Sequence, residues 1–210
     1  MPSDRKLSIE RYRTYAKTYD KQQTRNTTAE RNRERAIELL RMQPGETVLD
    51  AGCGTGLNFS LIEKIIGPGG RIIGLDQSPE MLAQAKERVS ANGWQNVTLI
   101  EAAAEDAKIP APADAILFGF THDILQSDAA LENIFRYAKP GARVASIGYK
   151  WAAWWALPWN YVIWNMTRRS LTTRENFGAP WRKLVRYVPG LRYDTAFGGA
   201  LYVAQGTTDS

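Results

Sequence analysis

The sequence predicts a doubly wound α/β fold, with a mostly parallel seven-stranded sheet that ends in an antiparallel C-terminal hairpin. Five short apolar runs alternate with segments of helical spacing. A glycine-rich loop follows the first run, and two further runs flank Gly198-Gly199 near the C-terminus. Alternation of strand and helix specifies right-handed crossovers and a parallel sheet that is covered on both faces.

The first predicted element is an amphipathic helix. It opens at Thr27, where Thr27 and Glu30 have the spacing of a capping box. Apolar residues then recur on one face of the helix, at Ala36, Ile37, Leu39 and Leu40.

Five buried parallel strands are predicted next, because each run is short and apolar at its centre. They cover residues 46–50, 71–76, 97–100, 114–118 and 143–147.

Helices are predicted between these strands. Residues 57–66 are compatible with a helix, and at 78–80 Ser78 is placed to cap a helix whose first position is Pro79. Helical spacing returns before a predicted turn at 139–141, with apolar residues at Leu131, Ile134, Phe135 and Ala138.

The C-terminal end has the pattern of a hairpin. Residues 191–197 and 201–205 are strand-like and flank the two glycines. We therefore expect the sheet to finish with an antiparallel pair.

Composition indicates one globular domain. The chain has 210 residues, 44% of them hydrophobic and 23% charged, with a net charge of +5. A modest basic surplus is compatible with nucleic acid, an anionic membrane face or an acidic metabolite. With Cys53 and His122 as the single residues of their types, we expect no intrachain disulfide and no metal. The charged N-terminal residues lack the apolar stretch of a secretory signal, so we expect a cytoplasmic protein.

The loop from Asp50 to Gly56 is the strongest indication of a ligand site. Its glycines let the backbone turn sharply and approach a ligand closely. Asp76, at the end of the second strand, is placed to accept hydrogen bonds from both hydroxyls of a ribose. The loop has two alternative interpretations: a dinucleotide-binding site, and a turn that binds no ligand. Asp50 would repel a pyrophosphate but would attract the ammonium group of a bound amino acid.

Residues 12–131 resemble the class I S-adenosylmethionine-dependent methyltransferases that act on small molecules. The matching segments are 15–20, 48–56, 74–82 and 104–106, in the order that the family has them. The resemblance implies a Rossmann-like fold and S-adenosylmethionine as cofactor. It also implies that Gly52, Gly54 and Gly56 cradle the methionine part, that Asp76 binds the ribose, and that Gln77 and Met81 lie near the adenine.

One position departs from the family. Where an aspartate often contacts the adenine amino group, this chain has Ala103, directly before Ala104-Glu105. We therefore expect backbone groups at Ala104, or the side chain of Glu105, to hold the adenine.

The resemblance divides the chain into four parts of a single domain. Residues 1–43 would be an N-terminal lid and helix, 44–150 the cofactor-binding core, 151–190 a Trp-rich insertion on the acceptor side, and 191–205 the hairpin. Tyr12, Tyr15 and Tyr19 fall in the lid, where packing is their simplest role. Tyr19, next to Asp20, is kept as a cofactor-binding candidate.

Residues after the fourth strand supply the candidates for catalysis. Phe120, His122 and Asp123 fall at the carboxyl edge of the sheet, where such folds bind their ligands. Phe120 is expected to contact the cofactor, and His122, with Asp123, to remove a proton from the acceptor. Methyl transfer from a sulfonium needs a base only when the acceptor must lose a proton. Alternatively, His122 has a structural role and supports the cofactor-binding loop.

Residues 151–166 have no charge and contain five tryptophans. This run is too short to span a membrane, and Pro158 interrupts it. The tryptophans could pack as core, wall an acceptor pocket, or seek a membrane interface with Arg168 and Arg169 beside them.

The sequence thus predicts methyl transfer to nitrogen or oxygen of a small apolar or amphipathic acceptor. A lipid or lipid-quinone methyltransferase at a membrane surface is one alternative, and a non-catalytic S-adenosylmethionine-binding module is another. Nucleic acid is a less favoured partner, because the aromatic residues do not interleave with basic ones.

Overall fold

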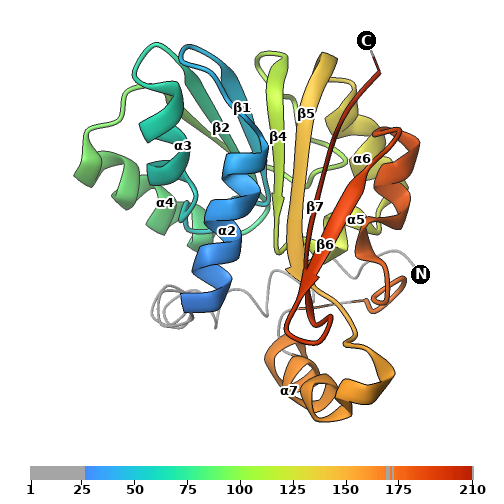
Figure 1. Ribbon diagram of the computed structural model, residues 1–210. Helices are drawn as coiled ribbons and strands as arrows, with labels where there is room; N and C mark the ends of the chain where they lie inside the picture. Colours follow the sequence, from blue (N-terminus) through green and yellow to red (C-terminus); the bar gives the residue numbers. More distant parts are fainter. Residues whose placement is uncertain (1–26, 169–170, 172, 210) are drawn as a thin grey trace.

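A seven-stranded sheet runs through the part of the chain that the computed structural model describes, residues 27–168, 171 and 173–209 (Figure 1). Its order is β3-β2-β1-β4-β5-β7-β6. Strands β1 to β5 are parallel to one another, and β7 is antiparallel to both β5 and β6, which confirms the predicted sheet. The strands are β1 (Thr47–Ala51), β2 (Arg71–Asp76), β3 (Val97–Glu101), β4 (Ala113–Gly119), β5 (Ala138–Tyr149), β6 (Arg192–Ala196) and β7 (Leu201–Thr207).

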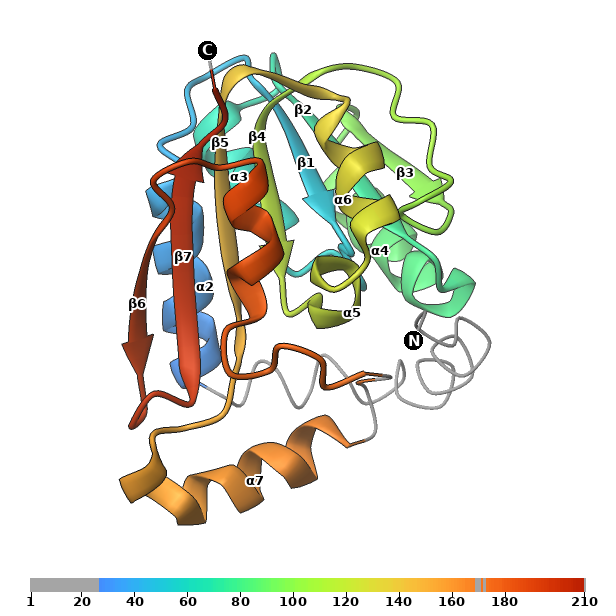
Figure 2. The ribbon, with the colours of Figure 1, turned by 90° about the vertical axis from the view of Figure 1, so that its right-hand side faces the viewer.

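Helices cover both faces of the sheet (Figures 1 and 2). One face carries α2 (Thr27–Leu39), α3 (Phe59–Ile66) and α4 (Pro79–Asn92). The other carries α5 (His122–Leu125), α6 (Asp128–Phe135) and the 3₁₀ helix η2 (Pro180–Arg186). Side chains alternate along each strand, so Val48 packs under the first set of helices and its neighbour Leu49 under the second.

The start of α4 follows the sequence prediction. Ser78 accepts a hydrogen bond from the Met81 N–H at 3.3 Å, and Pro79 takes the first helical position. Gly93, in the left-handed region, ends the helix. The helix predicted from Thr27 is present as α2, but the proposed capping contact of Thr27 lies outside the described side chains.

The predicted turn at 139–141 is wrong, because these residues belong to β5. Pairing with β4 joins Ala113 to Ala138 and resumes at Ala115 with Arg143, so the residues between them bulge out of register. Gly141, with φ +71°, allows this irregularity. Although 139–141 have no partner on β4 in this register, they are continuous with the strand, and Ala138 lies in β5 rather than in α6. Similarly, α3 begins at Phe59, later than the expected 57.

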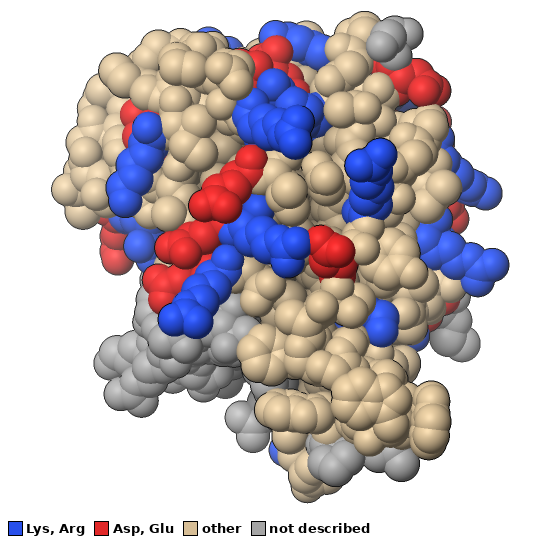
Figure 3. Space-filling view, viewed as in Figure 1, with Lys and Arg blue, Asp and Glu red and all other residues tan. Residues whose placement is uncertain are grey.

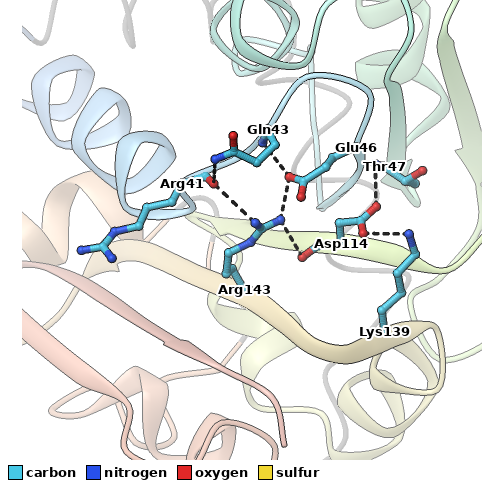
Figure 4. Close-up of polar contacts among 7 residues, drawn as sticks. All are labelled: Arg41, Gln43, Glu46, Thr47, Asp114, Lys139 and Arg143. Atoms are coloured by element: carbon cyan, nitrogen blue, oxygen red, sulfur yellow. Dashed lines mark hydrogen bonds and ion pairs between the residues drawn. The ribbon is translucent and has the colours of Figure 1, made fainter. Parts of the chain in front are cut away.

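Polar contacts join the strands at the end of the sheet where β1 and β4 begin. The Arg143 guanidinium donates to Glu46 at 2.6 Å, and Lys139 donates to Asp114 at 2.7 Å. Partial burial acts to raise the pKa of Asp114. The Lys139 ammonium and the Thr47 N–H outweigh this effect and hold the pKa below its usual range. This charged network is structural, because the strand ends that carry the candidate site lie at the opposite edge. Figure 4 shows its members, which are Arg41, Gln43, Glu46, Thr47, Asp114, Lys139 and Arg143.

A short lobe lies outside these layers, at the bottom of Figures 1 and 2. It consists of the 3₁₀ helix η1 (Trp154–Ala156) and helix α7 (Leu157–Thr167), and we call it the α7 lobe. A small cluster separate from the two main cores joins it to the sheet: Ala152, Ala156, Ile163, Leu171, Phe177 and Ala200. None of the helices in the described residues is long and apolar enough to cross a bilayer.

Candidate functional site

A pocket opens at the carboxyl ends of β1, β2 and β4. Strand order reverses at β1, whose neighbours are β2 and β4, and the loops that leave such a switch point diverge to opposite faces and form a crevice. The pocket holds about 910 Å³ of empty space, its open mouth included. Its lining comprises Gly52, Gly54, Leu75, Asp76, Gln77, Met81, Ala102, Ala104, Glu105, Gly119, Phe120, Thr121, His122, Asp123, Ile124, Ser127, Ala130 and Leu171.

The glycine-rich loop forms one wall of the pocket. The N–H groups of Gly52 and Cys53 both donate to the Leu75 carbonyl, at 2.7 and 2.9 Å, so the chain turns sharply at the end of β1. Gly52 has φ +79°, and a Cβ there would lie 2.3 Å from the Thr121 methyl group. A Cβ on Gly54 would meet open space instead. Gly52 thus permits the close approach of two loops, and Gly54 leaves room for a ligand.

Gly56 lies where the glycine-rich loop enters α3, and the role that the resemblance implies for it stays a prediction. It is absent from the pocket lining, and a Cβ there would lie 2.6 Å from the Phe59 ring. Its φ of +75° turns the chain into α3. In the described structure Gly56 therefore packs the loop against the helix.

Asp76 lines the pocket at the end of β2, and the ribose contact that the resemblance implies for it stays a prediction. Its two carboxylate oxygens each accept one backbone hydrogen bond at 2.9 Å, from Ser78 and from Gly54. Burial raises the pKa of Asp76, and these N–H groups oppose the shift. Each carboxylate oxygen has further acceptor capacity, so Asp76 can hold the glycine loop in place and still accept from a ligand diol.

Gln77, Met81, Ala104 and Glu105 also line the pocket. Ala103 is buried and is not part of the lining. The side-chain amide of Asn133 donates to the Ala104 and Ala107 carbonyls, at 2.8 and 2.9 Å. This amide fixes the loop after β3, a function that no local motif in the sequence indicated.

Asp50 is fully buried beneath the glycine loop and does not line the pocket. One of its carboxylate oxygens accepts from the Asn58 amide at 2.9 Å, and the other has no hydrogen-bond partner among the described residues. Burial raises the pKa of Asp50 to about 7, although Asn58 and Arg33 favour the charged form. The proposed contact of Tyr19 with the cofactor lies outside the described residues.

The segment after β4 forms the opposite wall of the pocket. Phe120 has φ +60°, uncommon for a residue with a side chain, and its N–H donates to Ile147 at 2.7 Å. Its ring lies 5.6 Å from the Arg33 guanidinium. Phe120, His122 and Asp123 all line the pocket, so this wall contains the residues that the sequence singled out here.

His122 is buried and packs edge-on against Phe177, with ring centroids 5.1 Å apart. Neither ring nitrogen has a hydrogen-bond partner of good geometry among the described residues. Burial lowers the pKa of His122 to about 4, and the Glu175 backbone opposes this shift only in part. The imidazole is therefore neutral near pH 7 and has acceptor capacity.

Several lining residues were missed by the sequence analysis, and Thr121 and Leu171 are two of them. The Thr121 hydroxyl is buried without a hydrogen-bond partner in the described structure. Leu171 reaches the pocket from the segment after α7. Thr121 stands next to His122 in the chain and could have been included, but no local signal pointed to Leu171.

Comparisons with known proteins identify relatives for the core of the chain. Residues 42–167 match the methyltransferase domain family. An arsenite methyltransferase of Halobacterium salinarum is 32% identical over 108 residues, 50% of this chain and 27% of that protein. A demethylmenaquinone methyltransferase of Listeria monocytogenes is 33% identical over 117 residues, 55% of this chain and 49% of that protein. The matched regions thus span half or less of these curated relatives.

Solved structures share the fold. A SAM-dependent methyltransferase from Aquifex aeolicus has a TM-score of 0.56 and 25% identity, and the match covers 84% of this chain and 89% of that one. A SAM-dependent O-methyltransferase from Thermotoga maritima has a TM-score of 0.61 and 12% identity, over 86% of this chain and 65% of that one. The chain therefore belongs to the methyltransferase domain family, and its resemblance to the class I S-adenosylmethionine-dependent methyltransferases is confirmed.

Proposed function

We propose that this protein transfers the methyl group of S-adenosylmethionine to nitrogen or oxygen of a small apolar or amphipathic acceptor. One observation carries the proposal. A single pocket joins the glycine loop and Asp76 on one wall to Phe120 and His122 on the other. A cofactor held by the first wall would present its reactive group to an acceptor held by the second.

The residues of the pocket fit this cofactor. The Asp76 carboxylate suits the ribose diol, and Gly54 leaves open space where the amino-acid part would lie. The free carboxylate oxygen of Asp50 lies beneath this loop and would favour a positively charged ligand above it. When bound, S-adenosylmethionine supplies a methyl group on a sulfonium, which is a good leaving group.

The protein would contribute alignment and a dry environment. Leu75, Ile124 and Leu171 give the pocket apolar walls, which restrict water around the reacting groups. The neutral His122 imidazole can accept a proton from an acceptor hydroxyl or amine, and we assign it that role, with Asp123 beside it. A depressed pKa makes His122 a weaker base than an ordinary histidine, so alignment is the larger part of the proposed catalysis.

A lipid or lipid-quinone acceptor is a second candidate function. The exposed tryptophans of the α7 lobe favour it, since the segment that follows the lobe contributes Leu171 to the pocket. One of the relatives is named a demethylmenaquinone methyltransferase, which is consistent with an apolar acceptor for this chain as well.

A transfer assay tests the proposal. The purified protein is incubated with S-adenosylmethionine carrying a tritiated methyl group and with cell extracts separated into lipid, aqueous-metabolite and nucleic-acid fractions. We expect the label to appear in the lipid or metabolite fraction. With the Asp76→Ala variant, we expect no label in either fraction. Label confined to nucleic acid would overturn the acceptor class.

Calorimetry with the same variant tests the cofactor site. Asp76→Ala should weaken S-adenosylmethionine binding by about 2 kcal/mol or more, because a buried charge-assisted contact is lost. Asp194→Ala, which removes an exposed carboxylate on β6, is the matched control and should leave affinity unchanged. Binding without transfer to any fraction would instead indicate a non-catalytic S-adenosylmethionine-binding module.

A further inference from the structure

The α7 lobe exposes large aromatic side chains on a protruding helix. Trp154 is 83% exposed, Tyr161 68% and Trp155 66%. The interpretation of these tryptophans as core is therefore wrong for Trp154 and Trp155. Among the residues of 151–166 whose side chains are described, none lines the pocket described above.

Few of the described side chains of α7 pack against the rest of the protein. Ile163 and Thr167, one turn apart, are its buried residues among those with described side chains, and Trp159, Val162 and Trp164 are exposed. A helix that is apolar around most of its circumference normally lies inside a core or in a membrane. In water this arrangement leaves apolar surface unburied on several sides of one helix.

We propose that the α7 lobe docks on the surface of an anionic lipid bilayer. The lobe projects from the end of the sheet as a convex element (Figures 1 and 2). A rigid partner would cover one side of such a helix, whereas the fluid interfacial region of a bilayer can surround it.

The side-chain types support the same partner. Tryptophan and tyrosine concentrate at membrane interfaces, where an apolar ring and a polar N–H or O–H are both accommodated. At 11 residues, α7 is about 16 Å long, far short of the roughly 30 Å hydrocarbon core. The lobe is therefore suited to lie in the interface.

Charge favours an anionic surface. From Lys150 to Arg174 the sequence has no Asp or Glu, and it has two further arginines, Arg168 and Arg169. The Arg168 guanidinium lies 5.5 Å from the Trp164 ring centroid, at the C-terminal end of α7. Figure 3 shows no acidic side chain on the lobe in that view. A cation beside exposed rings suits anionic lipid headgroups.

Docking would also bring the pocket close to the lipid. Leu171 is hydrogen-bonded to Thr167 at 2.9 Å and lines the pocket, so few residues separate the lobe from the site. Phe177 contacts both Trp151 at the base of the lobe and His122 in the pocket, with centroids 5.0 and 5.1 Å apart. This link to an apolar acceptor rests on the proposed function, whereas the docking itself does not.

Vesicle cosedimentation tests the docking without cofactor or acceptor. The full-length protein is mixed with phosphatidylcholine vesicles that contain or lack phosphatidylglycerol, at low and high salt. We expect binding to the anionic vesicles, weakened by salt. Trp154→Ala/Trp155→Ala should lower the partition coefficient roughly tenfold or more, and Arg168→Ala about fivefold. Tyr193→Ala, which removes an exposed aromatic side chain from β6, is the matched control and should bind as the wild type does.

Two outcomes would overturn the inference. The first is a wild-type protein that stays in the supernatant with both vesicle types at low salt. The second is a wild-type dimer that dissociates in Trp154→Ala/Trp155→Ala and binds no vesicles, because a second copy would then cover the lobe. Vesicle binding without methyl transfer would refute the proposed function and leave the docking intact, and transfer without vesicle binding would do the reverse.

Discussion

The pocket and the α7 lobe lie at the same end of the sheet, but their side chains meet water in opposite ways. Around the pocket, polar groups such as Asp50, Thr121 and His122 are buried and have unused hydrogen-bonding capacity. In the lobe, large apolar rings such as Trp154 are exposed. Both arrangements are costly for an isolated protein, and the partners that we propose would relieve them: a polar ligand in the pocket and an apolar phase around the lobe.

Tryptophans show this difference most directly, because one lies buried in the core and others are exposed in the α7 lobe. Trp181, in η2, is buried between Tyr193 and Tyr202, with centroids 4.1 and 4.7 Å away. Trp181→Ala should therefore destabilise the protein by about 3 to 5 kcal/mol, since a large cavity is left in the core. Thermal unfolding would show a melting temperature about 10 °C lower. A change of only a degree or two would mean that η2 does not pack as described.

The next largest effect is expected at Gly52. In Gly52→Ala the new Cβ would meet the Thr121 methyl group at a position with φ +79°, so the two walls of the pocket must separate. We expect S-adenosylmethionine affinity, measured by calorimetry, to fall about 100-fold. Gly45→Ala is the control, because Gly45 also has positive φ but a Cβ there meets open space. If Gly52→Ala and Gly45→Ala lost the same amount of affinity, the close approach of Gly52 to Thr121 would not be what shapes the pocket.

His122→Ala tests whether the buried imidazole takes part in the reaction. Turnover should fall about tenfold or more with cofactor affinity nearly unchanged. A folded-state pKa of about 4 means that the basic form is present above that pH and is lost as pH falls through it. Wild-type rates should thus show no step from His122 between about pH 5 and 8. A loss of cofactor affinity without loss of turnover would assign His122 to bracing the loop.

Asp50 gives a smaller, pH-dependent effect. With a pKa of about 7 in the folded protein against an ordinary 3.8, the folded state binds more protons between these values. Its contribution to stability therefore falls as pH rises through this window. Asp50→Asn should raise the melting temperature by about 5 °C near pH 8 and change it little near pH 4. Asp194→Asn, at an exposed carboxylate, should show no such dependence, and a destabilised Asp50→Asn would contradict the assignment.

The smallest effect is expected in the α7 lobe. Trp154→Ala/Trp155→Ala should change the free energy of unfolding by less than about 1 kcal/mol, because both rings are already in water. Denaturant unfolding in parallel with Trp181→Ala gives the measurement. A loss of stability as large as that of Trp181→Ala would show that the lobe folds back onto the protein. The lobe tryptophans would then be buried as Trp181 is.

Much of the cofactor side of the pocket could be predicted from the sequence. Gly52, Gly54, Asp76, Gln77, Met81, Ala104 and Glu105 all line the concavity, as do Phe120, His122 and Asp123. They follow the ends of parallel strands, and those ends meet at one edge of the sheet. Asp50 and Gly56 share the motif but lie beneath or beside the pocket, because a motif fixes spacing along the chain and not which side chain faces a ligand.

The sequence by itself determined the features that depend on neighbouring residues: the parallel strands, the Ser78 cap, the glycine loop and the C-terminal hairpin. Tertiary structure decided the features that depend on distant partners. Residues 139–141 became part of β5, and the fold brought Thr121 against Gly52 and Leu171 into the pocket. The orientation of 151–166 belongs to this second group, because an uncharged aromatic run is compatible with a core, a pocket wall or an exposed lobe. Which of these forms depends on whether other elements supply a surface to cover it, and for Trp154 and Trp155 no described element does.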